Sequence, residues 1–265
     1  MVGSLGMTKQ LLRVSVVDFL NARPLTWGLL HEPPPGVSVS RDAPSTCAAK
    51  LASGEADVGL IPSIECQRIP GLSVLSGLGI AASSEVRSVL LVSDVSRDRI
   101  TSVELDPASR TSAALTRILL KRVYGLEPEY REGSAGARAD ARLIIGDPAL
   151  KTRLNGHVVL DLAAEWRAFT ERSFVFAVWA VRDGVDAALA ARVLRASRER
   201  GRAEFPRLVR EESAETGLSE AVVEDYLRHS LHFELSPEDV EGMELFYRLA
   251  AEERLIPEVR PLRFF

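Results

Sequence analysis

Four loops carry hydroxyl, amide or carboxylate side chains directly after apolar segments that have the composition of strands. In the first loop, Asn21 precedes Pro24, a residue suited to the first turn of a helix. The Asn21 amide offers a donor and an acceptor to a small ligand, or it caps the helix, and the sequence leaves both interpretations open. Arg23 is more typical of an ion pair than of a carboxylate ligand.

The second and third loops contribute serines. Ser63 follows the apolar segment 56–61 and either donates to a ligand or caps a short helix, with the cap favoured. Glu65 is better suited to the first turn of that helix than to the role of a base. Ser84 precedes a valine-rich segment, where a hydroxyl at a hinge could close over an anion.

The fourth loop, DPASRTS at 106–112, leads into a strongly helical segment. The first N–H groups of a helix have no partner within the helix and carry partial positive charge, so they bind anions. Ser109, Thr111 and Ser112 add three hydroxyl donors. This clustering favours a carboxylate site over an ordinary cap followed by a polar first turn.

We expect the segment IGDP at 145–148 to face that helix start. Gly146 would let a ligand approach the backbone closely, and Asp147 either orients a donor or caps the next helix. Neither a nucleophile elbow nor a P-loop nor a dinucleotide-binding fingerprint occurs in the sequence. These residues therefore predict a cleft that binds a small carboxylate, but they do not indicate which reaction takes place there.

The elements that position these loops alternate between strand and helix, which predicts an α/β fold with ligands at the carboxyl ends of the strands. The expected strands are 11–19, 37–41 and 56–61, and the expected helices are 24–30 and 47–54.

Two valine-rich segments, 86–93 and Phe174–Arg182, enclose a separate block of strands and one helix. We interpret them as crossings between two lobes, each a mixed sheet flanked by helices. Lobe one is expected over 8–90 plus 180–265, lobe two over 91–179, and the ligand cleft between them. Helices expected over 187–210, over 219–231 and after Ser236 would cover lobe one.

Composition narrows the class of protein. The chain has 265 residues, 46% of them hydrophobic, and a net charge of −4. Because no basic face is visible, nucleic acid is not an expected partner. The two cysteines, Cys47 and Cys66, and the four histidines show no metal-ligand spacing, so no metal or cofactor is predicted.

No run approaches the roughly 18 apolar residues that would span a bilayer. Residues 1–10 lack the pattern of a secretory leader, so we expect a cytoplasmic protein. The sequence leaves open whether residues 1–6 are native and what the oligomeric state is.

Five motifs occur in order: DFLNARPL, ADVGLIPSIE, SEVRSVLLVS, SRTS and LIIGDPAL. Together they resemble the chorismate dehydratase family of the futalosine route to menaquinone, from about residue 11 to the end of the chain. The resemblance implies a type II periplasmic-binding-protein-like fold used as an enzyme. It also implies a carbon–oxygen lyase (hydro-lyase) that converts chorismate to 3-[(1-carboxyvinyl)oxy]benzoate and water.

By this resemblance, Asn21 would be the catalytic residue, bonding the departing hydroxyl or the ring substituents. Thr111 and Ser112 would bind a carboxylate of the substrate, and Ser63 and Ser84 would also contact the substrate. Because these motifs contain no obvious base, we hypothesise that the enolpyruvyl carboxylate of the substrate takes the proton while the enzyme fixes the reactive conformer.

Two alternatives compete with this interpretation. A related naphthoate synthase of the same pathway would carry a histidine near Gly146, and this chain has none there. A solute-binding protein for a small carboxylate shares the fold but needs export, for which residues 1–10 show no leader.

Overall fold

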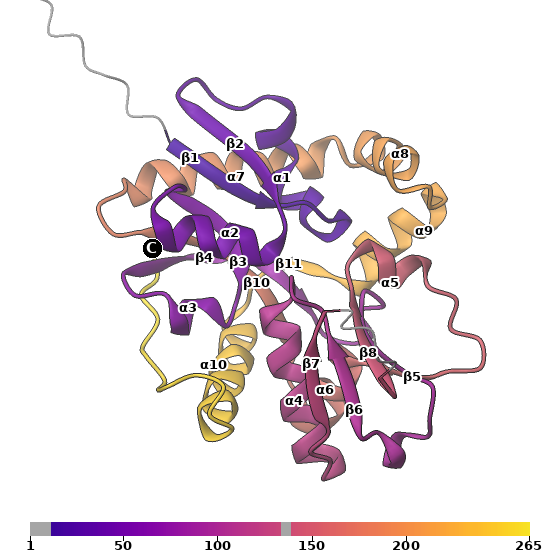
Figure 1. Ribbon diagram of the computed structural model, residues 1–265. Coiled ribbons are helices and arrows are strands. Elements are labelled where there is room, and N and C mark those ends of the chain that lie inside the picture. The colour runs from indigo at the N-terminus through magenta and orange to yellow at the C-terminus, as the bar shows by residue number, and fades with distance from the viewer. Residues whose placement is uncertain (1–11, 134–138) are drawn as a thin grey trace, which may run out of the picture.

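The computed structural model describes residues 12–133 and 139–265. Within these ranges the strands form two mixed sheets, one six-stranded and one five-stranded, with helices packed around both (Figure 1). The predicted α/β class with two helix-flanked sheets is confirmed. The cytoplasmic location depends on residues 1–10, which lie outside the described ranges, and stays a prediction.

The first sheet has the strand order β11-β4-β10-β3-β1-β2. β1 pairs in parallel with β2 and β3, and β10 pairs antiparallel with β3 and β4. β3 is buried at every position, as expected for a central strand with elements on both faces. The strands are β1 (Leu12–Val17), β2 (Val37–Asp42), β3 (Val58–Pro62), β4 (Leu72–Ala82), β10 (Phe174–Arg182) and β11 (His232–Glu234).

The second sheet has the order β7-β6-β8-β5-β9. β5 pairs antiparallel with β8 and β9, and β6 pairs in parallel with β7 and β8. The strands are β5 (Val89–Ser93), β6 (Ser102–Leu105), β7 (Glu129–Glu132), β8 (Ala141–Ile145) and β9 (Val158–Asp161).

The helices complete both units. The C-terminal helices α7 to α10 come after the return to the first sheet, and α4 to α6 accompany the second (Figure 1). The α-helices are α1 (Arg23–His31), α2 (Pro44–Ser53), α3 (Glu65–Arg68), α4 (Arg110–Tyr124), α5 (Asp147–Lys151), α6 (Leu162–Thr170), α7 (Ala187–Ala203), α8 (Phe205–Thr216), α9 (Glu220–Asp225) and α10 (Pro237–Glu252). Short 3₁₀ turns are η1 (Leu20–Ala22) and η2 (Arg97–Arg99), and η3 (Tyr226–Ser230) is π-helical.

Several elements differ from their predicted form. The helix expected over 187–210 breaks at Glu204, because Pro206 starts a new helix at its first turn. The helix expected over 219–231 changes from α9 into the π-helical η3. β4 was not predicted, since Gly77 and Gly79 interrupt its apolar pattern.

The two valine-rich segments belong to different sheets. β5 lies in the second sheet and β10 lies wholly in the first, so the strands straddle the expected lobe bounds at 90 and 179. The chain passes to the second sheet between β4 and β5, and it returns between β9 and β10. The division into two lobes that move relative to one another stays a prediction.

An aromatic cluster packs at the return crossing. The ring of Trp166 on α6 lies edge-on to Phe174 of β10, with centroids 5.3 Å apart. Phe246 on α10 lies 5.0 Å from Phe174 and 6.2 Å from Trp166. All three rings are fully buried, so the cluster joins a helix of the second sheet to a strand of the first.

Candidate functional site

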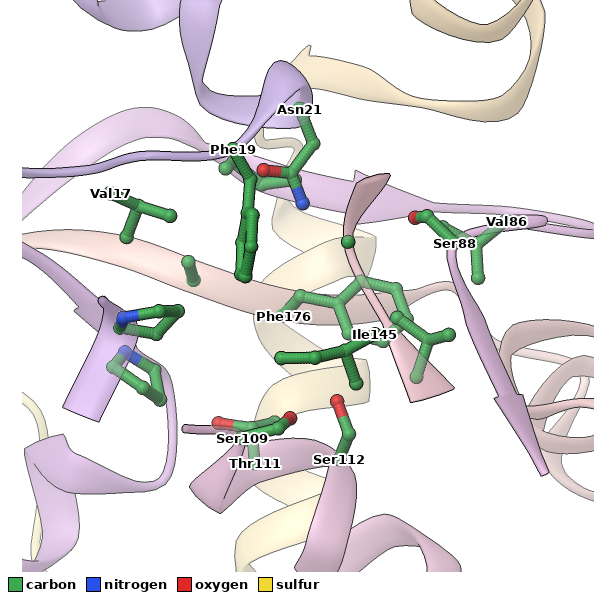
Figure 2. A pocket seen from close by; sticks show the side chains of 16 residues that line it. Val17, Phe19, Asn21, Val86, Ser88, Ser109, Thr111, Ser112, Ile145 and Phe176 are labelled. Atoms are coloured by element: carbon green, nitrogen blue, oxygen red, sulfur yellow. The ribbon is translucent and has the colours of Figure 1, made fainter. Parts of the chain in front are cut away.

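One cavity is lined from both sheets, close to the carboxyl ends of β1, β3 and β8 (Figure 2). Its volume is about 60 Å³. Its walls are mostly apolar: Val17, Phe19, Pro44, Pro62, Ile80, Val86, Val89, Ile145, Gly146, Phe176 and Ala177. Its polar lining residues are Asn21, Ser88, Ser109, Thr111 and Ser112.

The Asn21 side chain points toward the cavity from η1 (Figure 2). The residue before α1 is Ala22, and no side chain caps this helix, so the alternative of a helix cap at Asn21 is not observed. The Asn21 Oδ1 atom is buried without a hydrogen-bond partner among the described residues. An unpaired buried amide atom costs about 1–3 kcal/mol, a cost that a hydrogen-bonding ligand would remove.

The start of α4 forms the opposite end of the cavity (Figure 2). Thr111 Oγ1 accepts a hydrogen bond from the backbone N–H of Ile64 at 3.2 Å, and its proton can be donated to a ligand or to Ser63 Oγ at 3.5 Å. Ser109 precedes the helix, and its side chain makes no capping bond. These hydroxyls, with that of Ser112 and the unpaired first N–H groups of the helix, form a set of donors suited to a carboxylate.

Ser63 and Ser84 do not line the cavity. Ser63 is fully buried, donates to the Val175 carbonyl at 2.8 Å and lies 3.5 Å from Thr111 Oγ1, so it supports Thr111 from behind. Ser84 is exposed. Ser88, four residues further on, occupies the wall instead.

Ser88 was not among the predicted site residues. Its Oγ accepts a hydrogen bond from the Tyr226 hydroxyl at 2.7 Å, and its carbonyl accepts one from the backbone N–H of Gly146 at 2.8 Å. A serine inside an otherwise apolar strand segment was the available clue. Because Ser88 lies just before β5 begins, and strand boundaries are poorly determined by local pattern, the sequence alone could not tell which serine of this motif faces the cavity.

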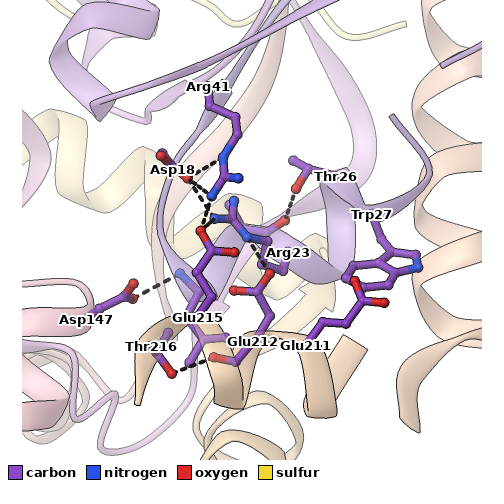
Figure 3. Close-up of polar contacts among 12 residues, drawn as sticks. Asp18, Arg23, Thr26, Trp27, Arg41, Asp147, Glu211, Glu212, Glu215 and Thr216 are labelled. Atoms are coloured by element: carbon purple, nitrogen blue, oxygen red, sulfur yellow. Dashed lines mark hydrogen bonds and ion pairs between the residues drawn. The ribbon is translucent and has the colours of Figure 1, made fainter. Parts of the chain in front are cut away.

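Gly146 and Asp147 hold the Asn21 loop in place. Asp147 Oδ1 accepts a hydrogen bond from the backbone N–H of Leu20 at 3.0 Å (Figure 3). Gly146 has φ +66°, and a Cβ there would lie 2.8 Å from Cδ1 of Phe19. Gly146 therefore lines the wall as expected, whereas Asp147 binds the loop from outside the lining. Burial raises the pKa of the Asp147 carboxyl.

The arginines near the motifs are all engaged with protein groups. Arg23 is buried and pairs with Glu212 at 2.8 Å and with Asp18 at 2.7 Å, as expected for an ion pair (Figure 3). Arg110 pairs at 2.7 Å with the buried carboxylate of Glu65. Charge at the cavity therefore comes from helix amides and hydroxyls rather than from guanidinium groups.

The residues that line the cavity include no histidine, lysine, aspartate or glutamate. Cys47 and Cys66 are buried and unpaired, and burial raises the pKa of both thiols to about 12, so neither is a ready nucleophile. Over 12–133 and 139–265, no cluster of three or more His, Cys, Asp or Glu side chains could hold a metal. No helix in these ranges could cross a membrane.

This chain is similar to known proteins over most of its length. A family model described as "Menaquinone biosynthesis" matches residues 12–252. The chain belongs to this family. A chorismate dehydratase from Thermus thermophilus is 28% identical to this chain over 251 residues, covering 86% of this chain and 91% of its own.

Solved structures show the same fold at low identity. Protein AF1704 from Archaeoglobus fulgidus superposes with a TM-score of 0.77 at 15% identity, over 94% of this chain and all of its own (100%). The periplasmic aliphatic sulphonate binding protein SsuA from Escherichia coli superposes with a TM-score of 0.63 at 18% identity, over 95% and 92%. The predicted periplasmic-binding-protein-like fold is thereby confirmed for this member of the menaquinone biosynthesis family.

Proposed function

We propose that this protein is a chorismate dehydratase that converts chorismate to 3-[(1-carboxyvinyl)oxy]benzoate and water in menaquinone biosynthesis. One observation carries the proposal. The cavity has apolar walls, polar donors at opposite ends and no titratable side chain in its lining. Such a site suits a flat ring with polar groups at both ends, and it suits a reaction that takes its base from the substrate.

The polar groups of chorismate match those ends. Its ring carboxylate would lie at the start of α4, where the amides and the hydroxyls of Thr111 and Ser112 can donate to it. The hydroxyl on the opposite side of the ring would then face Asn21 and Ser88. Phe19 and Phe176 would cover the ring between these ends.

The reaction is an elimination. The enolpyruvyl carboxylate of the substrate removes the proton from the ring carbon that carries the ether, the C–H electron pair forms the new ring double bond, and the C–O bond to the hydroxyl on the adjacent ring carbon breaks. The departing hydroxide takes up the proton that the carboxylate removed, so water leaves and the carboxylate is restored. Aromatisation supplies the driving force, so the protein has to hold the reactive conformer, keep other water out and donate hydrogen bonds to the leaving oxygen.

The direct test is to incubate the purified protein with chorismate and follow the aromatic product by liquid chromatography. Asn21→Asp and Thr111→Ala should each lower kcat/KM by about 10²-fold, the size expected when a donor to developing charge is lost. Asn155→Asp and Thr216→Ala are matched controls, because Asn155 is exposed and the Thr216 hydroxyl bonds Glu212 of its own helix and the backbone N–H of Leu218 next to it, away from the cavity.

Two outcomes would count against the proposal. Full activity in both site variants would reject the site. A wild-type protein that binds chorismate without forming product would favour a solute-binding role on the same fold.

A further inference from the structure

Ser88 receives its hydrogen bond from a residue far along the chain. Tyr226 lies in the π-helical η3, is buried, and places its hydroxyl 2.7 Å from Ser88 Oγ as the donor. π-helical turns are uncommon and are frequently found at functional sites. The described contacts of Tyr226 include no other side-chain hydrogen bond.

A second set of contacts fixes the same junction. Arg87, the neighbour of Ser88, donates from Nε to Ser230 Oγ at 2.8 Å and pairs with Asp225 at 2.8 Å. Its guanidinium also lies 5.9 Å from the centroid of the Tyr226 ring. The segment that carries Ser88 is therefore held against η3 at several points. These contacts keep the Tyr226 hydroxyl within hydrogen-bond distance of Ser88.

The hydroxyl of a serine has one proton and can accept as well as donate. Because Tyr226 donates the proton in the hydrogen bond between its hydroxyl oxygen and Ser88 Oγ, the proton of the Ser88 hydroxyl has to point elsewhere. Ser88 lines the cavity, and no described acceptor takes a hydrogen bond from its hydroxyl.

We propose that Tyr226 is a positioning residue that turns the Ser88 hydroxyl proton into the cavity, toward the departing hydroxyl of the substrate. The inference rests on the proposed function and adds a residue that does not line the cavity. Burial raises the pKa of the Tyr226 phenol well above its usual range, so it stays a donor over the working pH range. It acts through Ser88 and does not transfer a proton itself.

The test is a double-mutant cycle on kcat and KM for chorismate. Tyr226→Phe removes only the phenolic oxygen and should lower kcat about tenfold with little change in KM, the size of one lost neutral hydrogen bond. Ser88→Ala should lower kcat by about 10²-fold. In the Ser88→Ala background, Tyr226→Phe should have no further effect, because the group it orients is absent.

Tyr124→Phe is the matched control, since the Tyr124 hydroxyl also bonds a side chain, that of Glu165, but at the far end of α4. It should leave kcat unchanged. If the role of Tyr226 is purely structural, Tyr226→Phe should instead lower Tm, and its loss of kcat should multiply with the loss caused by Ser88→Ala. That result would overturn the inference.

Other results separate this inference from the proposed function. If both the wild type and Tyr226→Phe are fully active, the role of Tyr226 is rejected while the proposed function stands. If the wild type binds chorismate without forming product, the same double-mutant cycle is measured as binding affinity by calorimetry. Losses of binding free energy that simply add between the two variants would then reject the inference. A wild type that neither binds nor converts chorismate would overturn both.

Discussion

The carboxylate of Asp147 accepts the backbone N–H of Leu20 across the two sheets, at 3.0 Å. Leu20 immediately precedes Asn21, so this bond helps to fix the Asn21 amide at the cavity, together with the packing of Phe19 on Gly146. The same half-buried carboxylate faces few other donors, and burial raises its pKa.

Asp147→Ala should lower kcat/KM about tenfold, because the loop loses one hydrogen bond that fixes Asn21. Asp147→Asn keeps an acceptor oxygen and should retain most of the activity. Steady-state kinetics of the two variants checks this. Equal losses in both would mean that charge at Asp147, rather than the bond to Leu20, matters.

The raised pKa of Asp147 also predicts a pH effect on stability. A carboxyl whose pKa is higher in the folded than in the unfolded state favours folding at low pH, and this contribution is lost as pH rises through the folded pKa. Asp147→Asn should therefore raise Tm at pH 7, by about 2 °C, with a smaller gain near pH 4. Thermal melts across pH test the sign, and a constant difference at all pH values would contradict it.

Gly146→Ala should be costly for two separate reasons. The backbone of Gly146, with φ +66° and ψ −148°, lies in a region open essentially to glycine alone, so a side chain there costs about 1–3 kcal/mol, and the new Cβ would meet the Phe19 ring. Gly184→Ala is the control, since Gly184 has φ +85° with nothing within 4 Å of an added Cβ. Gly146→Ala should lower Tm and kcat/KM more than the control, and Phe19→Leu should partly restore both. No difference between the two glycine variants would show that Phe19 simply moves aside.

Asp239 should make the protein sensitive to acid. It caps α10 in a capping box with Ser236 and also bonds His232 at 2.9 Å and the hydroxyl of Ser173, and these bonds lower its pKa although burial opposes them. A depressed pKa stabilises the fold above the unfolded value of about 3.9, and this stabilisation is lost as pH falls. Asp239→Asn should lower Tm at pH 7, and its difference from wild type should narrow as pH falls below about 4. A gap of equal size at pH 7 and at pH 3 would point to lost packing instead.

A substrate analogue tests the source of the base. Chorismate in which the enolpyruvyl carboxylate is replaced by a neutral amide should bind but not aromatise, because the cavity lining offers no titratable side chain in its place. Product formation is followed by chromatography and binding by calorimetry. Normal turnover of the analogue would require a protein base.

Local patterns in the sequence predicted the elements that carry the site. The apolar runs that became β1, β3 and β8 and the polar start of α4 placed Thr111 and Ser112 in the cavity. Loop residues were harder to place, since Ser84 is exposed and Ser88 lines the wall. The choice depends on where β5 begins, and element boundaries are poorly determined by local pattern.

Contacts between distant segments were beyond the sequence. Tyr226 and Ser88 are separated by 138 positions in the sequence. Their hydrogen bond depends on a π-helical turn that the local amino-acid composition does not predict. Likewise, β4 forms despite two glycines because pairing with β10 on one side and β11 on the other outweighs its weak local propensity.

The buried cluster of Trp166, Phe174 and Phe246 has a mechanical consequence. Because these rings join α6 of the second sheet to β10 of the first, a void left by truncating one of them would weaken the packing of both sheets at once. A change made far from the cavity could therefore alter the cavity walls, since these walls come from both sheets.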